Sequence, residues 1–206
     1  MNQFSIDTNR FLNERIQAFY HTDYLGYRKP GNPDYINTLK NTYNSHSEYS
    51  LKAAVQELID VLREDLPSIL RALKLKSLFV CVVPRAKVSY QPAQLLFKAT
   101  VRDALHQLTG FTDGTDSILR HTNTKTTHLP PNTPNYDNDG DIPYPGITAN
   151  TCNISSNVKD KSILLIDDIY TSSINIDEDA IQSLLNYGTR HVFFYSIGKT
   201  IQYRYY

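Results

Sequence analysis

The clearest pattern along the chain is a set of short, continuous apolar runs with amphipathic stretches between them. The runs cover residues 77–84 (SLFVCVVP), 162–168 (SILLIDD) and 191–198 (HVFFYSIG). Runs of this length, rich in Val, Ile and Phe, are typical of strands buried on both faces of a parallel sheet. A weaker run at residues 147–154 (ITANTCNI) is consistent with one further short strand.

The amphipathic stretches carry apolar residues at helical spacing. Residues 93–110 and 176–188 each end at a glycine, and the second has acidic residues in its first turn, as helix starts favour. Residues 45–65 open with the spacing of a capping box and predict a helix, after which Pro67 predicts the start of a second, short helix. Strands that alternate with helices predict an α/β fold with a mostly parallel central sheet.

The first 46 residues are polar and rich in tyrosine. The spacing of Phe11, Leu12, Ile16 and Phe19 predicts an amphipathic helix over residues 7–20. We therefore expect residues 1–76 to form an N-terminal helical lobe, and residues 77–206 to form the α/β core.

One long segment interrupts the core. Residues 121–146 hold half of the ten prolines and are rich in Asn, Asp and Thr. An irregular insert of this length in a compact domain is usually a functional lid, so we expect a mobile loop here.

Composition narrows the class of protein. The 206 residues include 21 Lys plus Arg and 21 Asp plus Glu, so the net charge is zero, which argues against a broad nucleic-acid binder but is compatible with a local basic pocket. Two cysteines are too few for a zinc ribbon or a disulfide scaffold. With no signal-like N-terminus and no long apolar run, we expect a cytoplasmic protein without a membrane span.

Candidate chemistry is concentrated in residues 163–175, ILLIDDIYTSSIN. Asp167 and Asp168 come at the end of a predicted strand, and hydroxyl side chains follow in the turn to the next helix. Ligands of open parallel sheets bind beyond the carboxyl ends of strands, and helix starts bind phosphate. Carboxylates can accept hydrogen bonds from the vicinal hydroxyls of a sugar. Next to a phosphate site, they indicate a phosphorylated ribose as the ligand. The simpler alternative is that these residues only cap the turn.

This stretch resembles the phosphoribosyl-pyrophosphate (PRPP) motif of type I phosphoribosyltransferases, in its competence-associated ComF-type or amidophosphoribosyltransferase-like branch. The resemblance covers roughly residues 77–200. It departs at Ser173, where the family has glycine, and at Asn175, where the family has threonine. It implies the type I phosphoribosyltransferase fold, with Asp167 and Asp168 binding the ribose hydroxyls directly or through Mg²⁺. The residues it places around the ribose and 5′-phosphate are Asp167, Asp168, Ile169, Tyr170, Thr171, Ser172, Ser173, Ile174 and Asn175.

The resemblance also assigns the other parts of a site. The loop after the first core strand would bind pyrophosphate through Arg85, Ala86 and Lys87. The segment at 121–146 lies where the family has a mobile hood loop. The residues of that region that would reach the leaving group as catalytic groups are Arg120, Lys125 and His128.

Two features of the sequence bear on the identity of the acceptor. Thr171 stands where enzymes for 6-oxopurines have an aspartate, which argues against hypoxanthine or guanine. The N-terminal lobe is left as the base-selecting or partner-binding part, and tyrosines of the YRYY tail, Tyr203, Tyr205 and Tyr206, are candidates for base stacking or for simple packing.

The sequence therefore favours a Mg²⁺-dependent phosphoribosyltransferase that uses PRPP and a small, nitrogenous acceptor. The alternative is a weakly catalytic PRPP- or nucleotide-binding module, or an effector subunit in a bacterial complex, because fold does not fix activity. A homodimer or a protein partner is compatible with either function, and a nucleic-acid target is the least favoured.

Overall fold

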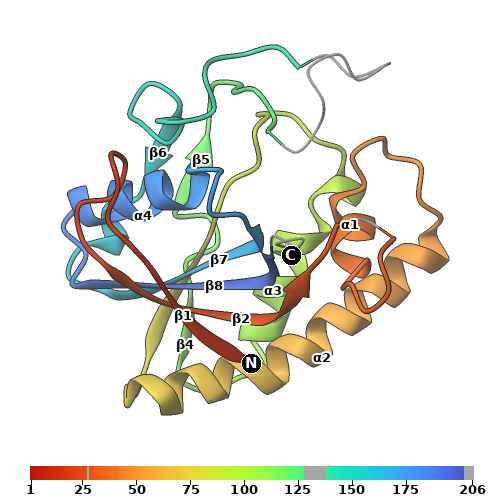
Figure 1. Ribbon diagram of the computed structural model, residues 1–206, viewed down its shortest axis with the longest axis horizontal. Coiled ribbons are helices and arrows are strands. Elements are labelled where there is room, and N and C mark those ends of the chain that lie inside the picture. The colour runs from red at the N-terminus through yellow and green to blue at the C-terminus, as the bar shows by residue number, and fades with distance from the viewer. Residues whose placement is uncertain (27, 128–137, 202–206) are drawn as a thin grey trace, which may run out of the picture.

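The computed structural model describes residues 1–26, 28–127 and 138–201 of the chain. Its centre is a six-stranded sheet with the strand order β1-β2-β8-β7-β3-β4 (Figure 1). The strands of this sheet are β1 (Asn2–Ile6), β2 (Ile16–Tyr24), β3 (Leu78–Val82), β4 (Phe111–Asp113), β7 (Ser162–Tyr170) and β8 (His191–Thr200). A separate two-stranded ribbon consists of β5 (Ile118–Arg120) and β6 (Cys152–Ile154).

The sheet is parallel except at one edge. Strand β1 runs antiparallel to β2, whereas the pairs β2–β8, β8–β7, β7–β3 and β3–β4 are all parallel. The predicted α/β class with a mostly parallel sheet is thus confirmed. The three long apolar runs form β3, β7 and β8. The ends of each strand differ from the ends of the predicted run by at most two residues.

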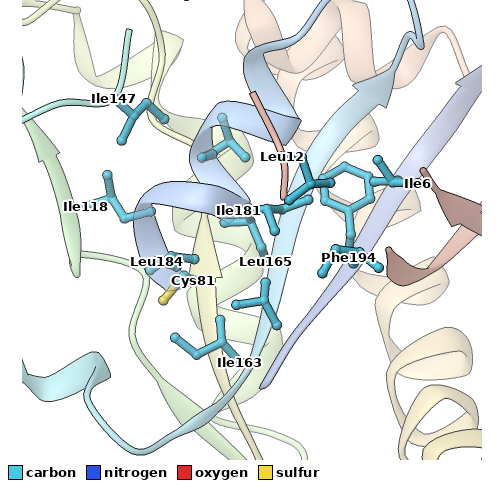
Figure 2. Close-up of a cluster of buried hydrophobic side chains, with 14 of the residues drawn as sticks. Ile6, Leu12, Cys81, Ile118, Ile147, Ile163, Leu165, Ile181, Leu184 and Phe194 are labelled. Atoms are coloured by element: carbon cyan, nitrogen blue, oxygen red, sulfur yellow. The ribbon is translucent and has the colours of Figure 1, made fainter. Parts of the chain in front are cut away.

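Helices cover both faces of the sheet. The helices are α1 (Tyr35–Lys40), α2 (Glu48–Leu73), α3 (Leu96–Leu105) and α4 (Ile176–Asn186). The first three pack on one face, against Leu164 and Ile166 of β7. On the other face, Ile181 and Leu184 of α4 pack against Ile163 of β7 and its neighbours (Figure 2). Alternate residues of β7 therefore belong to different cores, as a strand buried on both faces requires.

The predicted helix over residues 7–20 is wrong. Residues 16–24 form β2, which lies between β1 and β8 inside the sheet. Ile16 and Ala18 pack in the core under α4, whereas Phe19 packs in the core under α1 and α2. A strand buried on both faces does not alternate between apolar and polar residues, so the apolar residues of β2 have the spacing of a helical stripe. The first 76 residues consequently contribute two strands of the main sheet as well as two helices.

The predicted helix break at Pro67 is also wrong, because α2 continues through it to Leu73. Proline removes one helical hydrogen bond, but Leu62, Leu66 and Ile69 are fully buried on both sides of it. Packing against the sheet therefore holds the helix together across the proline. The N-cap of α2 is Ser47, whose hydroxyl accepts from the Ser50 N–H at 3.2 Å.

No helix within the described residues is long and apolar enough to cross a bilayer.

Candidate functional site

A cavity of about 660 Å³ lies at the carboxyl ends of β2, β3 and β7. The residues that follow α1 and the described residues on both sides of 128–137 complete its walls. Many of the residues singled out in the sequence line it, namely Arg85, Ala86, Arg120, Lys125, Asp167, Asp168, Ile169, Thr171 and Ile174. Parallel strands end at the same edge of a sheet, which is why segments far apart in sequence meet here.

The cavity opens beside β7 because β3 is shorter at this edge. The pairing of β3 with β7 ends at Val82 opposite Ile166, and the Val83 N–H donates to the Ile166 carbonyl at 3.0 Å. Strand β7 then continues without that neighbour to Tyr170. Asp167 and Asp168 lie on this extension, and both carboxylates border the cavity.

Lys40, the last residue of α1, reaches Asp168 across the cavity. Its Nζ lies 3.0 Å from Asp168 Oδ1, and both side chains are less than one-fifth exposed. Burial acts to lower the pKa of Lys40, but the carboxylates of Asp168 and Asp167 outweigh it, so the pKa is raised and the ammonium stays charged. The sequence alone does not reveal Lys40 as a site residue, because nothing in the pattern of residues 35–40 indicates which strand end the helix faces.

Asp167 has a different partner, Asp177, in the first turn of α4. Burial, together with the charge of Asp168, raises the pKa of Asp167 to about 7. Burial, together with the charge of Asp167, raises the pKa of Asp177 well above its ordinary value. The interaction between the two carboxyl groups raises the pKa of Asp177 further, and it lowers the pKa of Asp167 against the larger effect of burial. Asp177 is 3% exposed, and its Oδ1 has no hydrogen-bond partner among the described residues.

The two residues after Asp177 are also acidic and buried, and each has its own partner. Glu178 accepts a hydrogen bond from the Tyr170 hydroxyl at 3.0 Å. Asp179 accepts from the N–H groups of Gly146 and Ile147 at 2.6 and 2.8 Å. Carboxylates are favourable at a helix start. Here they fasten the 146–147 segment and the end of β7 to α4.

Tyr170 points away from the cavity. It is 5% exposed and its ring packs against Phe4 and Phe194 in the core. Although the resemblance includes Tyr170 in the ribose-phosphate loop, the residue does not line the cavity.

The turn at residues 171–175 is compact and partly exposed. The Ile174 N–H donates to the Thr171 carbonyl at 2.8 Å, and the hydroxyls of Thr171 and Thr200 lie 2.7 Å apart. Ser172 and Ser173 are exposed, and the backbone at Ser173 does not have a positive φ. The turn therefore does not need the glycine that the family motif has here. Of these five residues, Thr171 and Ile174 line the cavity, whereas Ser172, Ser173 and Asn175 do not.

The predicted pyrophosphate loop is divided between two surfaces. Arg85 lines the cavity, but its Nη1 donates to the Lys40 carbonyl at 2.7 Å and to the Gln94 carbonyl, and its guanidinium stacks 4.1 Å from the centre of the Tyr90 ring. Ala86 also lines the cavity. Lys87 faces a neighbouring hollow and pairs with Asp139 at 2.6 Å.

The three candidate catalytic residues, Arg120, Lys125 and His128, differ in their surroundings. Arg120 is half-buried, which lowers its pKa, and it donates to the carbonyls of Arg85 and Gly146 at 2.7 and 2.9 Å. Lys125 is exposed at the cavity wall, and its ammonium has no partner within the described ranges. His128 lies outside the described residues, as do Tyr203, Tyr205 and Tyr206. Lys125 is thus the loop cation most available to an anionic ligand.

A magnesium ion bound directly by the protein does not fit the carboxylates as they lie. Mg²⁺ prefers ionised oxygen ligands in octahedral geometry. Asp168 Oδ1 already pairs with Lys40 at 3.0 Å, and burial raises the pKa of Asp167 to about 7, which disfavours its ionised form. Within the part of the chain that the structure describes, no group of three His, Cys, Asp or Glu side chains is placed to hold a metal.

Neither the models of known protein families nor the curated protein sequences match this chain. The candidate site is therefore defined by its own geometry: paired carboxylates, a hydroxyl-bearing turn and cationic side chains around one cavity.

Proposed function

We propose that the chain is a phosphoribosyltransferase that binds PRPP in this cavity, moves its phosphoribosyl group to a nitrogenous acceptor and releases pyrophosphate. The observation that carries the proposal is the position of Asp167, Asp168 and Thr171, which border one wall of a 660 Å³ cavity whose other walls include Arg120 and Lys125. A ligand with a diol and two phosphorylated ends needs this combination of acceptors and cations.

The proposed reaction makes and breaks one bond at C1 of the ribose. The lone pair of the acceptor nitrogen forms the new N–C1 bond, the C1–O bond to the diphosphate breaks, and the acceptor nitrogen loses its proton to solvent. Pyrophosphate leaves with the bonding electrons. The protein would contribute mainly by positioning the reactants and by placing positive charge near the leaving group.

Each side chain has a role in this proposal. Asp168 Oδ2 would accept from a ribose hydroxyl, with Asp167 as its neighbour on the diol. The Thr171 hydroxyl, which lines the cavity, would donate to the 5′-phosphate. Lys125 and the remaining N–H groups of Arg120 would face the diphosphate. Mg²⁺ enters only as part of the substrate, bound by the diphosphate oxygens of PRPP.

The mixed sheet is compatible with a type I phosphoribosyltransferase fold, and the parallel β3, β7 and β8 with α4 correspond to the segment that carries the resemblance. We place the reaction in the cytoplasm, because Cys81 and Cys152 are both buried free thiols, which suits a reducing compartment. The residues after α1 that line the cavity, among them Tyr43 and His46, are our candidates for contact with the acceptor.

A binding function without turnover is the second candidate, and one observation favours it. Arg85 and Arg120 both donate N–H groups to backbone carbonyls of the protein, which leaves fewer N–H donors for a leaving group. A module of this kind would bind PRPP or a nucleotide and report its level to a partner or a second subunit.

Pyrophosphate release separates the two functions. Purified protein with Mg²⁺ and PRPP is supplied with a panel of purine bases, pyrimidine bases and small amines, and pyrophosphate is followed by a coupled assay. We expect release with at least one acceptor, and at least a hundredfold less, about 3 kcal/mol in transition-state stabilisation, in Asp167→Asn/Asp168→Asn.

Lys98→Met is the control, because Lys98 pairs with Asp116 at 2.6 Å and does not line the cavity. PRPP binding without release for any acceptor would favour the second candidate. Equal release by wild type and the double variant would contradict the assignment of the two carboxylates.

A further inference from the structure

Lys40 is the one cation within the described residues that makes an ion pair with a carboxylate of the cavity. Its Nζ is 3.0 Å from Asp168 Oδ1, and the side chain is 18% exposed. An ammonium has three N–H donors, and Asp168 uses one of them. Because Lys40 lines the cavity, its other donors are available to an anionic ligand there.

The backbone that carries Lys40 is braced from several sides. The Lys40 carbonyl accepts from Arg85 Nη1 at 2.7 Å. Asn41, which follows, is 1% exposed, and its Oδ1 accepts from the N–H groups of Ser45 and His46 at 3.0 and 3.2 Å. Gln94 Nε2 donates to the carbonyl of Asn41 at 3.1 Å. The end of α1 is thus fixed to the loop after β3, and the ammonium is presented by a rigid support.

The carboxylates around Lys40 make a cation necessary for an anionic ligand. Asp167, Asp168 and Asp177 all line the cavity. A diphosphate that approached these groups without a cation would be repelled. Sites for phosphate esters commonly solve this problem with a divalent cation held by one or two carboxylates and the phosphates. At Asp168 the position nearest the carboxylate is already taken by the ammonium of Lys40.

We propose that Lys40 takes the place of a protein-bound divalent cation at Asp168, so that the cavity binds a sugar diphosphate without a metal coordinated by the protein. The proposal rests on the proposed function for the class of ligand. Beyond the proposed function, it names Lys40 as the group that makes binding of the anion favourable. It also predicts that the ligand binds when divalent ions are removed.

The test is calorimetric titration with PRPP and, separately, with inorganic pyrophosphate, each in EDTA and in excess Mg²⁺. Wild type is expected to bind PRPP in EDTA within about threefold of its affinity in Mg²⁺. Lys40→Met keeps the length of the stem and removes the charge, and should weaken binding of both probes in EDTA by about 10- to 100-fold. Mg²⁺ should restore part of this loss, because Asp168 is then free to take the ion.

Two further variants act as controls. Lys40→Arg keeps a positive charge and donors at the same place, and should retain binding in EDTA within about fivefold. Lys98→Met removes an ion-paired lysine outside the cavity and should change nothing. Thermal unfolding of each variant confirms that the fold is intact before affinities are compared.

A direct measurement of metal binding gives a second readout. Mn²⁺ alone, followed by water-proton relaxation, should bind Lys40→Met at least about tenfold more tightly than wild type, because the variant exposes the Asp168 carboxylate. Tight Mn²⁺ binding by wild type that the substitution leaves unchanged would overturn the proposal.

The remaining outcomes separate this inference from the proposed function. Wild-type binding of PRPP that requires Mg²⁺, or equal binding by Lys40→Met in EDTA, overturns the role of Lys40 and leaves the transferase intact. Binding in EDTA that depends on Lys40, without pyrophosphate release for any acceptor, supports Lys40 and counts against the transferase. If wild type binds neither probe under any condition, both are overturned.

Discussion

At the scale of single residues, the candidate site is centred on Asp168, whose carboxylate pairs with Lys40 at 3.0 Å. Asp167 and Asp168 could be found because a local pattern, an apolar run that ends on two acids, places them at a strand end. Lys40 could not be found, because its pairing with Asp168 depends on how α1 lies over the sheet. Asp177 was visible only as an acidic residue in a helix start, and its contact with Asp167 arises where α4 meets β7.

The carboxyl pair Asp167–Asp177 predicts how stability depends on pH. In the folded protein the pKa of both groups is raised, and that of Asp167 is about 7. In the unfolded chain an aspartate has a pKa of about 4. Between these values the folded state holds a proton that the unfolded chain has released. The free energy of unfolding therefore falls as pH rises through this window, by at most about 1.4 kcal/mol per pH unit for one proton.

Asp177→Asn tests this dependence, because a neutral amide can hydrogen-bond to Asp167 but does not titrate. Urea unfolding measured from pH 5 to pH 8 should show a smaller fall for the variant than for wild type, and a more stable variant at pH 8. Glu178→Gln is the matched control, since burial also raises the pKa of Glu178 but its partner is Tyr170. Parallel curves for wild type and Asp177→Asn would show that the Asp167–Asp177 pair does not cause the pH dependence.

At the scale of elements, prediction succeeded where an element has a pattern of its own and failed where packing overrides the pattern. The strands β3, β7 and β8 were recognisable as short apolar runs. The sequence of β2 has the spacing of a helical stripe because Ile16 and Phe19 pack in cores on opposite faces of the sheet. The helix propensity of proline predicts a helix boundary at Pro67. Helix α2 continues through this residue because Leu66 and Ile69 on either side of it are buried.

A buried polar cluster joins α2 to the sheet. Asp65 of α2 is 1% exposed, and its Oδ2 accepts from the Tyr195 hydroxyl of β8 at 2.8 Å and lies 3.0 Å from His21 Nδ1 of β2. Tyr195 is fully buried. Loss of the Asp65 side chain would leave the Tyr195 hydroxyl without an acceptor. An unpaired polar group in the core costs free energy of folding.

We therefore expect Asp65→Ala to lower the free energy of unfolding by about 2–4 kcal/mol, measured by urea denaturation at pH 7. Adding Tyr195→Phe removes the orphaned hydroxyl, so Asp65→Ala/Tyr195→Phe should be more stable than Asp65→Ala alone. A double variant that is less stable than the single one would show that Tyr195 does not depend on Asp65.

At the scale of the whole molecule, the site exists because the parallel strands end together while α1 closes over them. The sequence predicts the α/β fold class and a mostly parallel sheet. It does not predict the strand order β1-β2-β8-β7-β3-β4, because the pattern of β2 does not identify it as a strand. The sequence therefore assigns residues 37–46 to a separate lobe, whereas six of them, among them Lys40, Tyr43 and His46, line the cavity. The acceptor side of the site depends on this long-range arrangement.

The measurement that tests the central claim most directly is calorimetric titration of PRPP with Mg²⁺ into wild type and into Asp167→Asn/Asp168→Asn. The claim predicts one site per chain in wild type, and an affinity about tenfold lower or weaker still in the double variant, because the ribose hydroxyls lose their carboxyl acceptors. The absence of PRPP binding by wild type, or equal binding by the folded double variant, would contradict it.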